Sequence, residues 1–140
     1  MIKKNININN LVSGKSRDLK GMVKPPADKS ISHRALLFSS LAIGKSEISN
    51  LLNSEDVLNM LKVLKLLGIK ITKKNNVYYV IGSGLTGFKT PNKHVDCGNS
   101  GTLARILIGA IGGSEVFVTL TGDNSLRARP MNRVMNPLRK

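Results

Sequence analysis

The sequence predicts an α/β fold built from a repeated unit with the order βαβαββ, present once in full and once shortened. Helical and strand-like apolar patterns alternate along the 140 residues. Two polar clusters, DKSISHR at 28–34 with its serines and basic residues and CGNSGT at 97–102 with its glycines and hydroxyl residues, each run directly into an apolar helical stretch. Hydrophobic residues make up 41% of the chain but aromatic residues only 4%, so we expect a core of leucine, isoleucine and valine.

In the first unit, acidic residues and glycines mark where helices begin and end. Glu55 and Asp56 favour a helix start through the helix dipole, and Gly44 and Gly68 favour helix ends. Two short strands are expected before this unit, at 2–8 and 19–23. Within it we expect a helix at 31–42, a strand at 46–51, a helix at 57–67 and a hairpin of strands at 69–72 and 77–81.

The second unit follows a glycine-rich loop at 82–87 and is incomplete. Its expected elements are a helix at 102–111, a strand at 116–120 and a helix that starts at Pro130, since proline suits the first helical position. Pro137 lies well inside this last helix and should kink it. The pattern stops before a second hairpin, which predicts that the chain is a fragment of a larger repeat protein.

The two clusters predict two anion-binding sites. The start of a helix presents unpaired backbone N–H groups and the positive end of the helix dipole. Lys29, Ser30 and Arg34 surround the first start, and Thr102 and Arg105 surround the second. Hydroxyl, ammonium and guanidinium groups at such positions favour phosphate or carboxylate, so we expect substrates that are anionic at more than one point. The alternative is that Ser30 and Thr102 serve only as helix caps.

Three motifs, taken in order, resemble the 5-enolpyruvylshikimate-3-phosphate synthase family. They are PADKSISHR at 26–34, GNSGTLAR at 98–105, and LTGD leading to RPM at 120–131. Each motif alone is weak, but three at family-like spacing within a repeated unit are specific. The resemblance covers roughly residues 19–140 and implies the enolpyruvyl transferase-type fold.

The resemblance also implies how the chain is divided. Residues 1–24 would be strands that pair with a half absent from this chain, and residues 25–140 would be a partial globular domain. Its complete unit would span about 28–84 and its truncated unit about 95–140. The acidic residues that move protons in the family belong to the absent half, so the isolated chain is expected to be inactive.

Members of that family transfer the enolpyruvyl (carboxyvinyl) group of phosphoenolpyruvate to the 5-hydroxyl of shikimate 3-phosphate and release phosphate, on the pathway to chorismate and the aromatic amino acids. The reaction is an addition followed by an elimination. The resemblance implies no metal, no cofactor and a monomeric full-length enzyme. The resemblance assigns Lys29 a catalytic role through its charge. It implies that Lys29, Ser30 and Arg34 bind shikimate 3-phosphate and that Lys29, Gly101 and Arg129 bind phosphoenolpyruvate. The residues with supporting roles would be Asn99, Thr102 and Arg105.

Two other functions compete with this interpretation. The sister transferase that acts on UDP-N-acetylglucosamine typically carries Lys-Asn where this chain has Lys29-Ser30, and a cysteine in the loop that here spans 122–128 without one. A nucleic-acid-binding module would fit the formal charge of +14. The lysines are spread along the chain without interleaved aromatic residues, however, so we expect no nucleic-acid partner.

The remaining features favour a cytoplasmic protein that is not embedded in a membrane. Cys97 is the single cysteine, so no intrachain disulfide can form. The first residues do not resemble a signal peptide, and no apolar run is long enough to cross a bilayer. Cys97 is expected to be a small buried residue whose pKa the nearby helix start could lower. His33 is expected to be structural or to support a residue that contacts substrate, and not to be a general base, because the resemblance assigns proton transfer to groups outside this segment.

Overall fold

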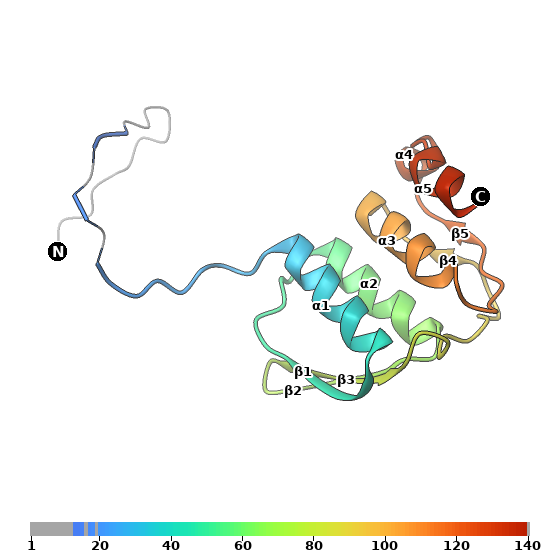
Figure 1. Cartoon of the computed structure of the whole chain (residues 1–140), viewed down its shortest axis with the longest axis horizontal. Coiled ribbons are helices and arrows are strands. Elements are labelled where there is room, and N and C mark those ends of the chain that lie inside the picture. The colour runs from blue at the N-terminus through green and yellow to red at the C-terminus, as the bar shows by residue number, and fades with distance from the viewer. Residues whose placement is uncertain (1–12, 16, 19, 140) are drawn as a thin grey trace.

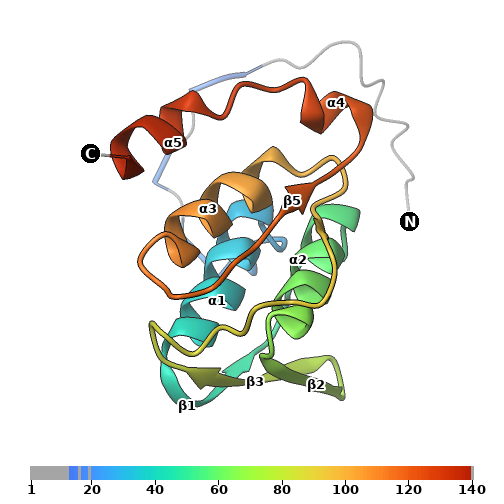
Figure 2. The same ribbon diagram turned by 90° about the vertical axis from the view of Figure 1, so that its right-hand side faces the viewer.

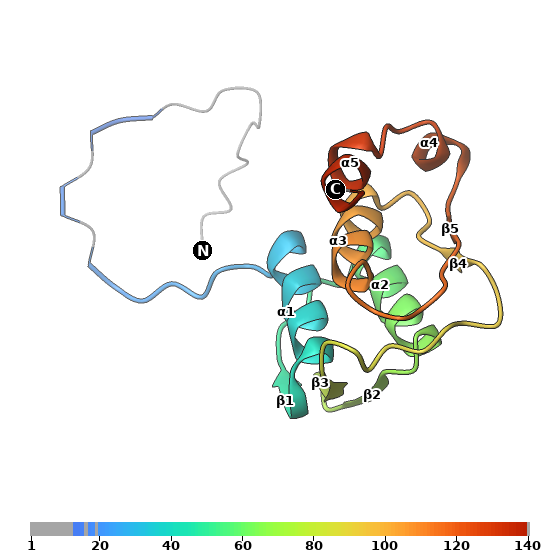
Figure 3. The same ribbon diagram turned by 45° about the vertical axis from the view of Figure 1, so that its right-hand side comes forward.

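The computed structural model describes residues 13–15, 17–18 and 20–139. The helices and strands, which begin at Lys29, are packed in layers (Figure 1). A three-stranded sheet lies at one side, α1 and α2 cover it, α3 packs on those helices, and α4 and α5 are outermost (Figure 2). Residues 20–28 extend away from the layers (Figure 1 and Figure 3). The elements follow the order α1 (Lys29–Leu41), β1 (Ile43–Ile48), α2 (Glu55–Leu66), β2 (Lys70–Lys74), β3 (Val77–Ser83), β4 (Val95–Asp96), α3 (Gly101–Ile111), β5 (Leu120–Thr121), α4 (Asn124–Arg127) and α5 (Asn132–Leu138).

The sheet has the strand order β1-β3-β2, and both pairings are antiparallel. β2 and β3 form the predicted hairpin, in which Lys74 pairs with Val77 across a two-residue turn. The turn residues Asn75 and Asn76 have φ values of 49° and 60°. Two consecutive residues with positive φ suit the right-handed twist of a tight hairpin, and asparagine tolerates that conformation better than most residues. The hairpin prediction is therefore confirmed.

The core is aliphatic, as the composition predicts. Leu36 of α1, Met60 and Leu64 of α2, and Leu103 and Leu107 of α3 are all fully buried. Each helix buries residues spaced three or four apart, which places them on one face. The buried faces of the three helices meet in one cluster, and this packing fixes how the helix starts lie relative to one another.

The bounds predicted for the first unit need two corrections. The strand expected at 46–51 is displaced, because β1 begins directly after the C-cap Ala42 and pairs with β3 from Ile43 onward. It ends before Asn50, whose φ of 56° breaks the extended conformation. The strand expected at 19–23 does not appear either: residues 20–23 form neither helix nor strand and are exposed. The expectation for 2–8 lies outside the described residues.

The second unit differs more from its prediction. The strand expected at 116–120 is reduced to β5, because its partner β4 offers only Val95 and Asp96 for parallel pairing. Neither β4 nor the short helix α4 was predicted. The last helix begins two residues after Pro130, with Met131 at its N-cap. Pro137 is its penultimate residue, so this proline lies at the end of a short helix and not at a kink inside a long one.

Among the described residues, no helix has the length and apolarity required to cross a bilayer. The longest helix, α1, contains 13 residues. A helix of this length reaches about 20 Å, which is shorter than the hydrocarbon core of a membrane.

Gly82 of β3 provides a test of the packing between the sheet and α1. A Cβ atom at this position would overlap the backbone carbonyl oxygens of Ser39 and Ala42. We expect Gly82→Ala to lower the free energy of unfolding by about 2 kcal/mol or more, because backbone atoms cannot move aside as a flexible side chain can. Urea denaturation followed by circular dichroism measures the change.

The matched control is Gly109→Ala in α3, where an added Cβ would meet no atom within 4 Å. This substitution should raise the free energy of unfolding by up to about 1 kcal/mol, since alanine is the better helix former. Equal effects of the two variants would contradict the packing described between β3 and the end of α1.

Candidate anion-binding site

Asp28 caps the start of α1. Its Oδ1 accepts a hydrogen bond of 2.7 Å from the backbone N–H of Ile31. The helix therefore begins at Lys29, two residues earlier than predicted, and Ser30 lies inside the first turn. The proposal that Ser30 caps this helix is wrong, because a residue within the first turn cannot occupy the N-cap position.

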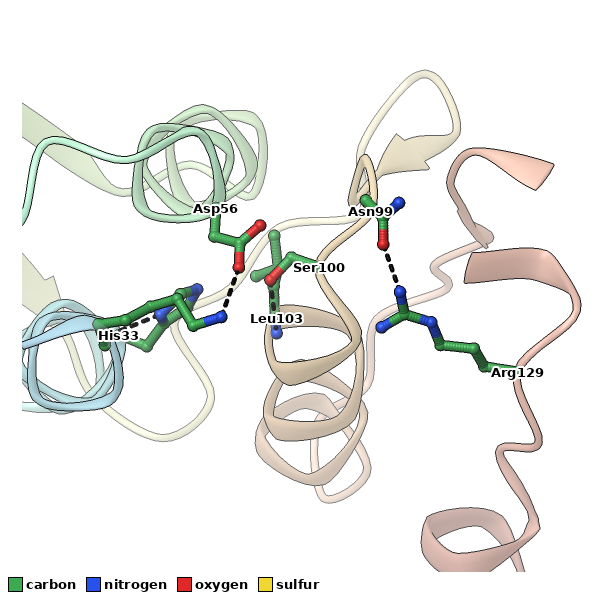
Figure 4. Close-up of polar contacts among 7 residues, drawn as sticks. His33, Asp56, Asn99, Ser100, Leu103 and Arg129 are labelled. Atoms are coloured by element: carbon green, nitrogen blue, oxygen red, sulfur yellow. Dashed lines mark hydrogen bonds and ion pairs between the residues drawn. The ribbon is translucent and has the colours of Figure 1, made fainter. Parts of the chain in front are cut away.

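Lys29 is held by a carboxylate from the next helix. Its Nζ lies 3.0 Å from Oδ2 of Asp56 in the first turn of α2 (Figure 4). The two side chains are 48% and 26% exposed, so the ion pair remains open to solvent and to a competing anion. Arg34, one turn further along α1, is exposed and forms no ion pair among the described residues.

Ser100 caps the start of α3. Its buried Oγ accepts a hydrogen bond of 3.3 Å from the backbone N–H of Leu103, so the helix begins at Gly101. Thr102 lies within the first turn and is partly buried. The alternative in which Thr102 is the cap is therefore also wrong. At both predicted sites, the residue that caps the helix lies two positions before the hydroxyl residue that was considered for the role.

Two guanidinium groups lie over Gly101. A Cβ atom at this position would be 2.8 Å from Nη1 of Arg105 and 2.9 Å from Nη1 of Arg129. Arg105 comes from the second turn of α3, and Arg129 comes from the loop between α4 and α5. The missing side chain of Gly101 thus lets two cations approach the same helix start, where backbone N–H groups already favour an anion.

A polar network fixes the direction of Arg129. Its Nη2 donates a hydrogen bond to Oδ1 of Asn99 (Figure 4) and a second one, of 3.3 Å, to Oγ of Ser125. Nδ2 of Asn99 in turn donates to Oδ2 of Asp123 at 2.7 Å. The other oxygen of Asp123 caps α4 by accepting from the N–H of Leu126. Arg129 is therefore connected through Asn99 to a carboxylate that is itself anchored to a helix.

Arg105 is anchored separately, because its Nη2 donates a hydrogen bond of 3.2 Å to the carbonyl oxygen of Pro130. The interaction joins α3 to the residue that follows Arg129 in the chain. The structure thus brings together the predicted residues Asn99, Gly101, Arg105 and Arg129. Asp56 was expected only as a helix-start residue, Asp123 only as part of the third motif, and Ser125 had no expected role, so none of the three was predicted to contact a residue of the site.

The first two turns of α2 lie next to the start of α1 and the loop that precedes α3. On one side Asp56 pairs with Lys29 of α1. On the other side Asn59 lies so close to Gly98 that a Cβ at that glycine would overlap its Nδ2. The φ of Gly98 is 58°, a conformation that glycine adopts without strain. The start of α1 and the loop that precedes α3 therefore both lie against the first two turns of α2.

This arrangement favours an anionic ligand. Lys29, Arg105 and Arg129 supply positive charge near the helix starts. The carboxylates nearby already have partners: Asp28, Asp56, Asp96 and Asp123. The two arginines offer planar forks suited to carboxylate or phosphate oxygens. Among the described residues, no group of three or more His, Cys, Asp or Glu side chains could hold a metal ion.

A cavity of about 220 Å³ adjoins this cluster of charges. Its wall combines apolar side chains from α3 and from the segment around α4 with the basic residues Arg127 and Arg129. A space of this kind could receive the apolar part of a small anion whose charged end meets Arg129. The residues that line it are Ala104, Ile108, Leu120, Thr121, Gly122, Leu126, Arg127, Arg129 and Met131.

Cys97 is fully buried, as predicted, but its pKa moves in the opposite direction from the one considered. Burial, together with the nearby charge of Asp96, raises the pKa of the Cys97 thiol to about 11. Loss of hydration disfavours the thiolate. The pKa is raised although α3 begins four residues further along the chain.

We expect the stability of the protein to depend on Cys97 at alkaline pH. The pKa of this thiol is higher in the folded state than in an unfolded chain, where it is about 8.5. The stabilising effect is therefore complete below about pH 8.5 and is lost as the pH rises toward 11, by roughly 1.4 kcal/mol for each unit. Urea unfolding measured between pH 7 and 10.5 tests this.

Cys97→Ala is the control, and it should remove the part of the pH dependence that begins near pH 8.5. Rapid labelling of native Cys97 by a thiol reagent at pH 8 would contradict the burial of the group, because only the thiolate reacts readily.

The sequence matches one family model over residues 14–140, that of EPSP synthase (3-phosphoshikimate 1-carboxyvinyltransferase). Among curated relatives, the 3-phosphoshikimate 1-carboxyvinyltransferase of Sulfurihydrogenibium sp. is 48% identical over 126 residues, which cover 90% of this chain and 29% of the relative. The enzyme of the same name from Thermodesulfovibrio yellowstonii is 47% identical over 130 residues, covering 92% of this chain and 30% of the relative.

A solved structure of EPSP synthase from Acinetobacter baumannii matches with a TM-score of 0.77 and 38% identity, covering 85% of this chain and 27% of that one. The chain thus spans slightly under one third of the length of the relatives it matches. The agreement of the family model, the relatives and the fold confirms the resemblance drawn from the three motifs. The chain belongs to the EPSP synthase (3-phosphoshikimate 1-carboxyvinyltransferase) family.

Proposed function

We propose that this chain supplies part of the substrate site of a 3-phosphoshikimate 1-carboxyvinyltransferase. In this reaction the 5-hydroxyl oxygen of shikimate 3-phosphate forms a bond to the central carbon of phosphoenolpyruvate, and the bond from that carbon to the phosphate oxygen breaks. The observation that carries the proposal is the pair of guanidinium groups over Gly101 at the start of α3, since phosphoenolpyruvate bears both a carboxylate and a phosphate.

Lys29 would serve both substrates. A lysine ammonium is a point charge with three donors, so it can contact two anions at once. Its ion pair with Asp56 holds it at the start of α1 and exchanges readily with an incoming anion, because both groups are partly exposed. Ser30 and Arg34, from the first two turns of α1, would bind shikimate 3-phosphate beside it.

Gly101 and Arg129 would line the phosphoenolpyruvate site, supported by Asn99, Thr102 and Arg105. Binding there places positive charge where the reaction releases negative charge, as phosphate leaves. The carboxylates that transfer protons are expected outside this chain, so the described residues bind and orient the substrates. We also retain the proposed division into residues 1–24 and 25–140, with units at about 28–84 and 95–140.

The alternatives are not favoured, because the family model and the curated relatives carry the name of the shikimate-pathway enzyme. The proposal includes a cytoplasmic location, which the single cysteine favours, and a monomeric full-length enzyme, which is taken from the resemblance. It needs no nucleic-acid partner, since the cations of the site are arranged around helix starts and not along a continuous strip.

We expect Lys29→Ala and Arg34→Ala each to weaken the binding of shikimate 3-phosphate to this chain by at least tenfold, which corresponds to about 1.4 kcal/mol. Each variant removes a cation that would contact the phosphate. Chemical-shift titration of the ¹⁵N-labelled chain with shikimate 3-phosphate measures the dissociation constant.

Lys70→Ala provides a control of equal charge change, since Lys70 is exposed on β2 in the sheet, away from the helix starts. An equal effect of all three variants would indicate nonspecific attraction to a basic surface. Binding that falls steeply with salt and does not distinguish shikimate 3-phosphate from an oligonucleotide would favour the nucleic-acid module instead.

Gly101→Ala should weaken the binding of phosphoenolpyruvate by at least tenfold while changing the free energy of unfolding by less than about 1 kcal/mol. The added Cβ would contact the ends of two flexible arginine side chains, which can move aside. Their displacement would change the arrangement of the two guanidinium groups that is proposed to bind the anion. Calorimetric titration with phosphoenolpyruvate gives the affinity, and Gly109→Ala in the same helix is the control. Unchanged affinity in Gly101→Ala would exclude the two arginines over Gly101 from the binding site.

A further inference from the structure

His33 is a fully buried imidazole that the proposed reaction does not use. It lies one helical turn after Lys29 in α1, and none of its surface is exposed. Its Nδ1 lies 2.9 Å from the backbone carbonyl oxygen of Lys29 (Figure 4). Its other nitrogen, Nε2, has no hydrogen-bond partner among the residues that the structure describes.

The contact with Lys29 determines where the ring carries its hydrogen. A carbonyl oxygen has lone pairs only, so the nitrogen that faces it must be the donor. In the neutral ring the hydrogen is therefore on Nδ1, and Nε2 is an acceptor. The carbonyl of Lys29 thus receives the His33 backbone N–H, in the ordinary helical pattern, and the imidazole N–H as well.

A leucine at this position would fill a similar space without burying an acceptor that lacks a donor, which is costly. What histidine adds, and leucine cannot, is the second hydrogen bond to the first carbonyl of the helix. Lys29 is then held at two points: His33 holds its backbone, and Asp56 holds its Nζ at 3.0 Å (Figure 4).

We propose that His33 is a positioning residue for Lys29. Through Nδ1–H it fixes the backbone of the first turn of α1 and thereby holds the Lys29 ammonium group where it contacts the substrates. The proposal rests on the proposed function, because it assigns His33 a role through a lysine that binds substrate. His33 itself touches no substrate and transfers no proton.

Two variants separate this role from simple packing. His33→Asn can place its amide nitrogen near the position of Nδ1 and keep the donor to Lys29, while it loses most of the ring. His33→Leu fills the core but has no donor. We expect His33→Leu to weaken the binding of shikimate 3-phosphate at least fivefold, and His33→Asn to stay within twofold of the unaltered chain, although it leaves the larger cavity.

If His33 served only to pack the core, His33→Asn would weaken the binding of shikimate 3-phosphate more than His33→Leu, because it removes more buried volume. The double variant with Lys29→Ala adds a second criterion. If His33 acts through Lys29, then adding His33→Leu to Lys29→Ala causes no further weakening. A further fivefold loss in the double variant, or weaker binding by His33→Asn than by His33→Leu, would overturn the proposal.

A ligand-free measurement keeps this test independent of the proposed function. Long-range ¹H–¹⁵N spectra of the unaltered chain report which ring nitrogen carries the hydrogen, and we expect Nδ1–H. A ring protonated on Nε2 alone would overturn the proposal whether or not any variant folds. If Lys29→Ala leaves the binding of shikimate 3-phosphate unchanged while the Nδ1–H form is observed, the proposed function fails at Lys29, and the positioning role for substrate fails with it. The hydrogen bond from His33 to Lys29 would then stand as a structural feature alone.

Discussion

The packing of α2 against the start of α1 and the loop that precedes α3 is the constraint on which the candidate site depends. Val57 and Met60 are buried in its first turns, so this helix cannot shift without disturbing the core. The same turns carry Asp56, which pairs with Lys29, and Asn59, which lies against Gly98. Aliphatic packing therefore sets the position of charged groups that belong to elements far apart in the sequence. The polar contacts then refine positions that the core has already limited.

Charge repulsion explains why the site needs its anchors. Arg105 and Arg129 both approach Gly101, and like charges at such short range repel each other. Each guanidinium points Nη1 at Gly101 and is held at Nη2 by an acceptor: the carbonyl of Pro130 for Arg105, and Asn99, backed by Asp123, for Arg129. These acceptors offset part of the repulsion while leaving other N–H groups for a ligand. An anion bound between the two guanidinium groups would offset most of the remaining charge repulsion.

The sequence predicted the elements whose signals are local. The cores of α1, α2 and α3 follow from apolar spacing, and the hairpin follows from two asparagines between two strand patterns. The pairing of β4 with β5 could not be predicted, since it joins two dipeptides about 25 residues apart and the Val95–Asp96 dipeptide has no strand pattern of its own. Both caps were misplaced by two residues, because serine, threonine and aspartate have similar preferences for the N-cap.

The residues of the candidate site were also predictable only where the signal was local in the sequence. The motifs identified the cations and Gly101, because a cation next to a helix start is a local pattern. The groups that orient those cations lie elsewhere in the chain: Asp56 is 27 positions from Lys29, and Asn99 is 30 positions from Arg129. Such partners are fixed by the fold and not by spacing. His33 is the exception, since its place four residues after Lys29 on a helix is itself local information. A buried side chain that supports a binding residue can therefore be sought on the same helix, one turn further along.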